Sequence, residues 1–275
     1  SLYNIDEQFE IELTSSINLE KILFELELSS EITDPIYNYN NSIGFSVDVS
    51  LNQYGFPIST SEFRSSPLVL DLDNDGDNEI IMGDNNGFVH VYNSDGTELE
   101  DSTFPFDTGN QIWGSAAAAD LDRDGFMDFV ITSKSKHLYI FDQNGLKVDY
   151  NADKYLMGTP AIGNLDADDD LEVVIGGYSS NNQIFVINHD GSDVDGFPLT
   201  ISEKTKGGIA LADYNGNGRD DIIACTDNDN VYLIYDDGVT AAGFPYTTGD
   251  KMQAAPTVID VGGEKIIFAG SNDDK

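Results

Sequence analysis

The sequence has few cations, a single cysteine and no long apolar run. Its 275 residues include 13 Lys plus Arg against 50 Asp plus Glu, which gives a formal net charge of −37. Such a charge excludes a nucleic-acid-binding protein that works by neutralising phosphates. No apolar stretch approaches the roughly 20 residues that a membrane-spanning helix needs. We therefore expect a globular chain with no membrane span and no nucleic-acid partner.

Helical signals are scarce as well, and the acids are of the kind that favours loops. There are 36 Asp and 14 Glu, and Asp favours turns and metal loops whereas Glu favours helices. Short runs of Val, Ile, Tyr and Phe alternate with clusters of Gly, Asn and Asp, a pattern typical of strands joined by tight turns. The single cysteine, Cys225, lies in such a run and can form no intrachain disulfide. The composition predicts an all-β protein.

One pattern recurs five times: a strand of small residues, an acidic loop, an aliphatic strand, and an aromatic strand that ends in a turn. The acidic loops begin at Asp71, Asp120, Asn164, Asp213 and Asp260, at separations of 49, 44, 49 and 47 residues. A period in the forties with several strands per unit is typical of propeller blades. The sequence therefore predicts a β-propeller of four-stranded blades, about five of which are visible in residues 54–275, with each loop joining the first two strands.

Within the first unit we expect strands at residues 65–70, 79–82 and 88–93, followed by a turn at Asp95-Gly96 and a fourth, outer strand. The first strands are rich in small residues, as expected of strands that crowd around the propeller axis. Phe-Pro dipeptides at residues 56–57, 104–105, 197–198 and 244–245 are expected at the unit ends, and the second unit has none.

Residues 1–53 do not follow the repeat, although residues 9–16, 21–30 and 44–51 alternate like strands. Two interpretations stay open. These residues form a separate β segment, such as the tail of a preceding domain, or they supply outer strands to the incomplete last blade and so close the ring. Since the chain begins without Met and ends inside a repeat, we expect it to be part of a longer protein.

The acidic loops have the pattern of a metal site. Seventeen of the 50 acids lie in four nine-residue loops, and carboxylates about 5 Å apart repel by about 3 kcal/mol per pair at an effective dielectric constant of 20. Side-chain oxygens at positions 1, 3 and 5 converge when the loop curls, glycine at position 6 permits the turn, and the acid at position 9 closes the shell. Position 7 offers its backbone carbonyl, from Asp77, Phe126, Asp170 and Arg219. Oxygen ligands in this number favour calcium over zinc, copper or magnesium.

The loops and their flanking strands resemble FG-GAP (VCBS-type) repeats, which form integrin α-subunit propellers and occur in many secreted bacterial proteins. The resemblance covers about residues 54–275. It implies a propeller, usually seven-bladed, with up to four structural Ca²⁺ ions on one face and ligands on the other. It also implies the side-chain ligands, which are Asp71, Asp73, Asp75 and Glu79; Asp120, Asp122, Asp124 and Asp128; Asn164, Asp166, Asp168 and Glu172; and Asp213, Asn215, Asn217 and Asp221.

The loops are not equal in sequence. The third replaces the glycine by Asp169 and the fourth has Asn215 and Asn217 at positions 3 and 5, so we expect weaker binding there than in the first two. The fifth, at residues 260–264, is shortened, and we expect it to hold no ion. The chain also has fewer complete blades than the family, which leaves the size of the ring open.

The sequence shows no nucleophile elbow and no phosphate-binding glycine loop, so we expect no catalysis. Larger residues seven positions before each loop, Arg64, Trp113, Met157, Lys206 and Gln253, either cap the axial channel or contact a ligand. Trp113 is the best candidate for stacking on a sugar or peptide.

Calcium loops with the affinity of extracellular modules are occupied only where the calcium concentration is about millimolar. We therefore expect an extracellular or cell-surface module for adhesion or for binding a glycan or protein. The alternatives are a structural accessory domain of a secreted hydrolase and an enzyme similar to polysaccharide lyases.

Overall fold

The computed structural model describes residues 21–33, 36–48, 55–59, 61–99 and 103–273. The chain divides into two compact units, Ser1–Pro57 and Ile58–Lys275. The boundary expected from the repeat falls among residues 49–54, outside the described residues. Among the described residues, no helix is long and apolar enough to cross a membrane.

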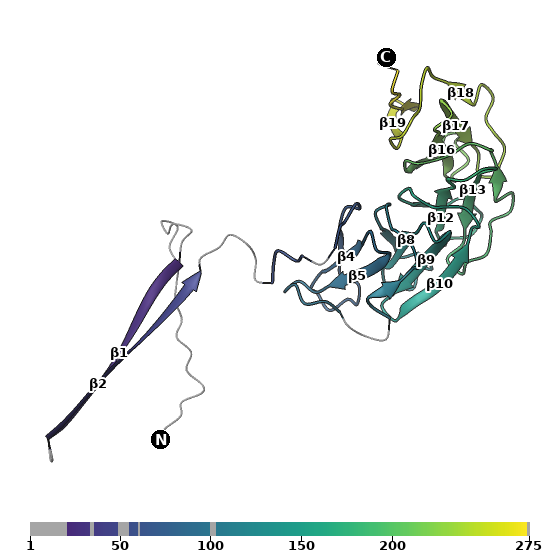
Figure 1. Cartoon of the computed structure of the whole chain (residues 1–275). Coiled ribbons are helices and arrows are strands. Elements are labelled where there is room, and N and C mark those ends of the chain that lie inside the picture. The colour runs from purple at the N-terminus through teal and green to yellow at the C-terminus, as the bar shows by residue number, and fades with distance from the viewer. Residues whose placement is uncertain (1–20, 34–35, 49–54, 60, 100–102, 274–275) are drawn as a thin grey trace. The chain divides into compact units, whose positions relative to one another are not determined.

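The described part of the first unit is a single long hairpin. Strands β1 (Lys21–Thr33) and β2 (Ile36–Asp48) pair antiparallel, from Lys21 opposite Asp48 to Thr33 opposite Ile36 (Figure 1). They form a sheet of their own with no other described strand. Both interpretations of residues 1–53 therefore stay open. The strand expected at residues 9–16 lies outside the described residues.

The second unit consists of propeller blades, as the repeat predicts. Four sheets have four strands each, and in every sheet the strands pair antiparallel in chain order (Figure 1). The blades are β3 (Leu68–Leu70), β4 (Glu79–Gly83), β5 (Phe88–Tyr92) and β6 (Phe106–Asp107); β7 (Ala117–Ala119), β8 (Asp128–Thr132), β9 (His137–Asp142) and β10 (Gly145–Asn151); β11 (Ala161–Gly163), β12 (Glu172–Gly176), β13 (Gln183–Ile187) and β14 (Leu199–Thr200); and β15 (Ile209–Ala212), β16 (Asp221–Cys225), β17 (Asn230–Ile234) and β18 (Tyr246–Thr247).

A fifth blade has only two described strands, β19 (Thr257–Val261) and β20 (Glu264–Phe268), joined by a turn at Gly262-Gly263. One face of this hairpin packs on the fourth blade through Val258 and Ile267. Its other large apolar side chains, Ile259, Val261, Ile266 and Phe268, are exposed. The described blades therefore do not close into a ring.

The hydrophobic core lies between the blades, because both faces of an inner blade are covered. Along β9, Tyr139 and Phe141 belong to the core shared with the first blade, whereas Leu138 and Ile140 belong to the core shared with the third. This is the alternation that a strand imposes on its side chains. All five residues of β8, of β12 and of β16 are buried for the same reason. Each blade is thus held by its neighbours.

Glycines where the chain enters the innermost strands let successive blades approach closely. A Cβ on Gly114 would lie 2.2 Å from the Gly158 carbonyl oxygen, and a Cβ on Gly158 would lie 2.5 Å from that of Gly207. Next to this contact, the Ser115 amide donates to Thr159 Oγ1 (3.0 Å), which joins the second and third blades. The small residues expected around the axis are therefore required by backbone contact between blades.

The Phe-Pro dipeptides lie one step earlier in the unit than expected. Residues 104–105, 197–198 and 244–245 directly precede the two-residue fourth strands β6, β14 and β18, so each dipeptide ends the connection from the third strand. In the second blade, which lacks the dipeptide, β10 follows β9 after a tight turn and is seven residues long. The second blade therefore has a longer fourth strand than the other three complete blades.

Candidate metal centres

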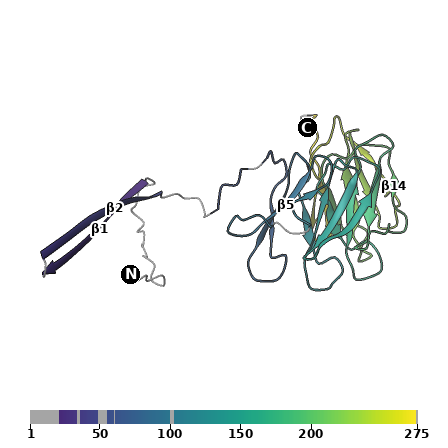
Figure 2. The same cartoon turned by 60° about the horizontal axis from the view of Figure 1, so that its bottom comes forward.

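Each of the four acidic loops connects the first and second strands of its blade. Figure 2 shows the strands of the blades side by side, with connecting loops at both ends. Hydrogen bonds join successive loops: Asn74 Nδ2 donates to the Gly125 carbonyl (3.2 Å), Arg123 Nε to the Asp169 carbonyl (2.8 Å), and the Asp220 amide to the Asn164 carbonyl (2.7 Å). The loops therefore form a continuous acidic surface.

Each loop is closed by the acid at position 9, which is the first residue of the second strand. This carboxylate accepts the backbone N–H of position 2 in every loop, at 2.9 Å from Leu72, 3.0 Å from Leu121, 2.5 Å from Leu165 and 2.8 Å from Tyr214. The position-9 acids Glu79, Asp128, Glu172 and Asp221 are all buried. The bond holds the loop curled and fixes one oxygen of each acid.

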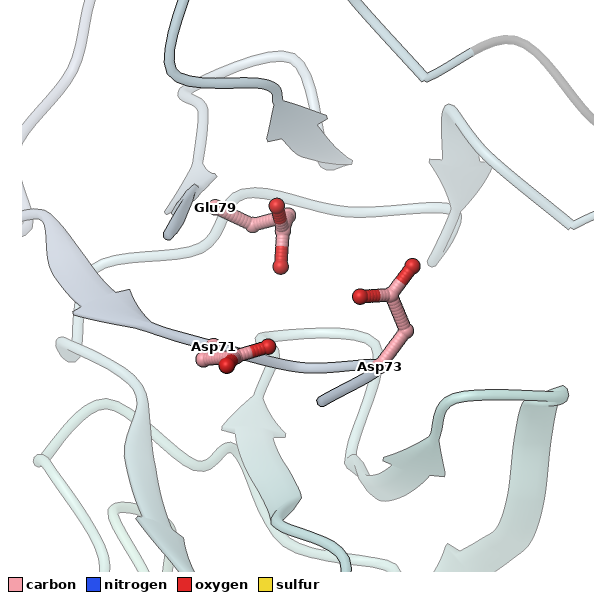
Figure 3. A group of neighbouring side chains, drawn as sticks. All are labelled: Asp71, Asp73 and Glu79. Atoms are coloured by element: carbon pink, nitrogen blue, oxygen red, sulfur yellow. The ribbon is translucent and has the colours of Figure 1, made fainter. Parts of the chain in front are cut away.

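The first, second and third loops each gather three carboxylates whose oxygens lie within 4.8 Å of one another. In the first loop Asp71, Asp73 and Glu79 face one another across a small space (Figure 3). The other groups are Asp120, Asp122 and Asp124 in the second loop, and Asp166, Asp168 and Glu172 in the third.

Two of the acids expected as ligands in the first three loops are outside these groups, and none of the four expected ligands of the fourth loop belongs to such a group among the described residues. Asp75 accepts the Asp77 amide (2.8 Å), and Asp128 is absent from the second group. In the third loop Asn164 donates its side-chain amide to the Asp168 carbonyl (3.0 Å). At position 6, Gly76, Gly125 and Gly218 have φ of 97°, 93° and 89°, as a sharp turn requires, whereas Asp169 is not among the residues with positive φ.

The third loop has the strongest electrostatic reason to take up a cation. The Glu172 side chain is 1% exposed, and its Oε1 has no hydrogen-bond partner among the described residues. Burial, with added repulsion from Asp166 and Asp168, raises the pKa of Glu172 from 4.5 to about 7. Burial also raises the pKa of Glu79 in the first loop, with repulsion from Asp73, Asp75 and Asp71 adding to it. A bound cation would remove both penalties, so these residues fit a metal ion.

The second loop contains a cation of the protein itself. Lys147 Nζ lies 2.7 Å from Asp122 Oδ2 and 3.3 Å from Asp128 Oδ1. Its hydrogen bond lowers the pKa of Asp122. Lys147 is not among the site residues predicted from the sequence. A signal was present, because the second unit is the one without Phe-Pro and therefore the one whose fourth strand continues directly from the hairpin.

In the fourth loop the acids at positions 3 and 5 are replaced by Asn215 and Asn217. The carboxylates that remain accept hydrogen bonds from groups of the protein itself. Asp221 accepts the amides of Tyr214, Asn215 and Asp236 at 2.8, 3.0 and 3.1 Å. The position-7 residue Arg219 pairs with Asp236 (3.1 Å), which also accepts Asn217 Nδ2 (2.9 Å). Asp213 accepts three loop amides, including that of Gly218. In the shortened fifth loop Asp260 pairs with Lys265 (2.8 Å).

At the opposite end of the blades lie the residues expected to surround the axial mouth. Arg64 and Gln253 are exposed, Trp113 and Lys206 are half-buried, and Met157 is 9% exposed and packed inside. The Arg64 guanidinium and the Lys134 ammonium lie 4.8 and 4.3 Å from the centre of the Trp113 ring. The single tryptophan is thus surrounded by two of the chain's few cations.

The pKa of Glu172 predicts a pH dependence of the metal-free chain. Because its folded-state pKa is raised, the contribution of Glu172 to stability is complete below pH 4.5, where Glu172 is protonated in both states, and is lost as the pH rises through about 7. A shift of this size corresponds to about 3 kcal/mol. We expect Glu172→Gln to remove this part of the loss. Urea unfolding of both proteins in EDTA at pH 5 and pH 8 measures it, and equal pH dependence of the two proteins would contradict it.

A family model of FG-GAP-like repeats matches residues 71–131 and 164–224. Each match spans two of the acidic loops. No curated protein matches the sequence.

Several solved structures share the fold. The chain aligns with BBS1N in its complex with ARL6DN at 12% identity and a TM-score of 0.54, covering 78% of this chain and 62% of that one. It aligns with the C-terminal domain of PilY1 from Pseudomonas aeruginosa at 18% identity and a TM-score of 0.52, covering 72% and 53%. It aligns with the computationally designed protein Ika8 at 14% identity and a TM-score of 0.52, covering 74% and 55%. This chain thus spans little more than half the length of these structures.

Proposed function

Because this chain carries FG-GAP-like repeats in the blades of a β-propeller, we propose that it is a calcium-stabilised binding module of an exported protein, without catalytic activity. The observation that carries the proposal is the buried oxygen of Glu172, which has no partner among the described residues and belongs to a group with Asp166 and Asp168. A buried carboxylate beside two others needs a counter-ion to stay charged.

Calcium fits these groups better than other metals. The converging atoms are carboxylate oxygens, with no sulfur or imidazole nitrogen, and calcium accepts many such ligands in flexible geometry. The ion would hold the connection between the first two strands and offset the repulsion between acids. Because sites of this kind at extracellular strength need about millimolar calcium, we place the protein outside the cell or on its surface.

The ligand surface would be the end of the blades opposite the acidic loops. There Trp113, Arg64 and Lys134 lie together, and an aromatic ring beside cations suits a glycan or protein segment that carries acidic groups. The acidic loops repel such a ligand from the other end. Adhesion through this surface is the function that the arrangement supports best.

One group of polar residues near this end has the residue types of a catalytic triad, but its hydrogen bonds connect them in a different order. Ser61 Oγ donates to Asp84 Oδ2 (2.5 Å), and His90 lies between Asp84 and Glu98. A nucleophilic serine needs its hydroxyl bonded to the imidazole, which would accept its proton. Here the hydroxyl is bonded to the carboxylate, so this group supports the turn before β5.

Binding to a glycan and peptide array, with a parallel assay for polysaccharide cleavage, tests the proposal. We expect the calcium-loaded chain to bind a defined acidic ligand without cleaving it, and Trp113→Ala to weaken this binding at least tenfold while leaving the Tm unchanged. Tyr246→Ala, which removes an exposed aromatic ring from β18, is the control and should bind as the unmodified chain does. Cleavage of a polysaccharide would support the lyase alternative, and absence of any ligand would support a structural role.

A further inference from the structure

The position-9 acids alternate in size along the blades. The first and third loops have Glu79 and Glu172, whereas the second and fourth have Asp128 and Asp221. In all four loops one oxygen of this acid accepts the position-2 amide. The loops therefore differ in what the second oxygen does.

In the first and third loops the position-9 glutamate is a member of the converging carboxylate group. Its second oxygen is available to a metal ion, and in Glu172 that atom is buried without a partner among the described residues. No Lys or Arg forms an ion pair with either glutamate in the described part of the chain. A bound cation would neutralise both groups while leaving their carboxylates ionised.

In the second loop Lys147 meets the second oxygen. Lys147 lies at a β-bulge of β10, where the register changes between Leu146 and Val148. A bulge re-aims the side chain of the extra residue, and here the ammonium reaches Asp122 and Asp128 at 2.7 and 3.3 Å. Asp128 is accordingly absent from the carboxylate group of this loop. The loop has a positive charge supplied by its own blade.

In the fourth loop protein donors meet the second oxygen. Asp221 Oδ1 accepts the Asp236 amide (3.1 Å) and the Asn215 side-chain amide (3.3 Å). Asn217 turns its amide to Asp236, which also pairs with Arg219. These contacts use the groups that would otherwise bind an ion.

We propose that only the first and third loops bind calcium tightly, because Lys147 acts as a tethered counter-ion in the second loop and internal hydrogen bonds replace the ion in the fourth. This inference rests on the proposed function, since it assigns that calcium to particular loops. It reverses the order of the second and third loops expected from the sequence, where glycine at position 6 favoured the second.

The second loop keeps the means to bind an ion if Lys147 is removed. Asp120 Oδ1 and Asp122 Oδ1 are buried without partners among the described residues, and both residues belong to the remaining carboxylate group. An ion entering this loop in the unmodified chain must displace the ammonium from Asp122. Lys147→Met keeps most of the apolar stem of the side chain and removes the ammonium group with its charge and its hydrogen bonds.

Calorimetric titration of the metal-free 275-residue chain with calcium tests the inference. We expect two tight ions in the unmodified chain and three in Lys147→Met, with the third bound at least tenfold more tightly than any further ion in the unmodified chain. Lys136→Met is the matched control, since Lys136 forms a surface ion pair with Asp153 at the other end of the blades. It should bind two. Equal ion numbers and affinities in the unmodified chain and Lys147→Met would overturn the inference.

A second pair of variants tests the assignment without altering Lys147. Asp71→Asn and Asp213→Asn make the same change at position 1 of the first and fourth loops. We expect Asp71→Asn to bind one tight ion and Asp213→Asn to bind two. The loss of one ion in both variants would overturn the inference while leaving the proposed function intact, whereas an unmodified chain that takes up no calcium would contradict the proposed function as well.

Discussion

Calcium is expected to raise the Tm of the metal-free chain by about 10–20 °C. An ion at about 100 times its Kd stabilises the folded state by about 2.7 kcal/mol, and two tight sites would together give about 5 kcal/mol. In a protein of this size each kcal/mol corresponds to about 2–4 °C. The physical cause is the neutralisation of Glu79 and Glu172, whose burial raises their pKa and leaves their charged forms unfavourable without a cation.

Thermal unfolding in EDTA, and after addition of calcium or of magnesium, measures this effect. Magnesium should restore less of the Tm, because it requires near-octahedral geometry and gives up its water reluctantly. The double variant Asp71→Asn/Glu172→Gln should lose most of the response to calcium, whereas Asp250→Asn, at the opposite end of the blades, should keep it. A melting curve that EDTA leaves unchanged would mean that the loops are acidic turns without an ion.

Gly158→Ala is expected to destabilise the chain by about 3 kcal/mol, at the upper end of the usual cost of overpacking. The added Cβ would lie 2.5 Å from the Gly207 carbonyl oxygen. The oxygen is a backbone atom and the position of the Cβ is set by the backbone, so no side-chain rotation can relieve the contact. The third and fourth blades would have to separate, which would also loosen the apolar core between them.

Urea unfolding of the calcium-loaded chain measures the cost. Gly270→Ala is the control, because nothing lies within 4 Å of its added Cβ. It should change stability by less than about 0.5 kcal/mol. If Gly158→Ala unfolds at the same urea concentration as the unmodified chain, the close approach between the blades is not a determinant of stability.

The blades could be predicted from the sequence because their signals are local. The repeated loops fix the period, and the strand at residues 88–93 and its counterparts are recognisable from alternating aliphatic and aromatic residues. The structure places β5, β9, β13 and β17 at these segments. The convergence of Asp71, Asp73 and Glu79 also follows from spacing within a single loop.

The position of Lys147 could not be predicted in the same way. Whether it faces the second loop depends on the bulge that shifts the register of β10 against β9, and a shift of one residue sends a side chain to the other face of the sheet. The internal bonds of Asp221 likewise depend on Asp236, fifteen residues further along the chain. Such contacts depend on how strands pair, which spacing within one loop does not encode.

The cores that lie between blades have a consequence for how the second unit loses its structure. Since each core is shared by adjacent blades, the unit behaves as a one-dimensional array in which stability is a sum over neighbouring interfaces. An inner blade has two such interfaces, and the β19–β20 hairpin has one among the described residues. Unfolding is then expected to begin at the outer members of the array and to proceed inward. The blades would separate one after another and not in a single all-or-none step.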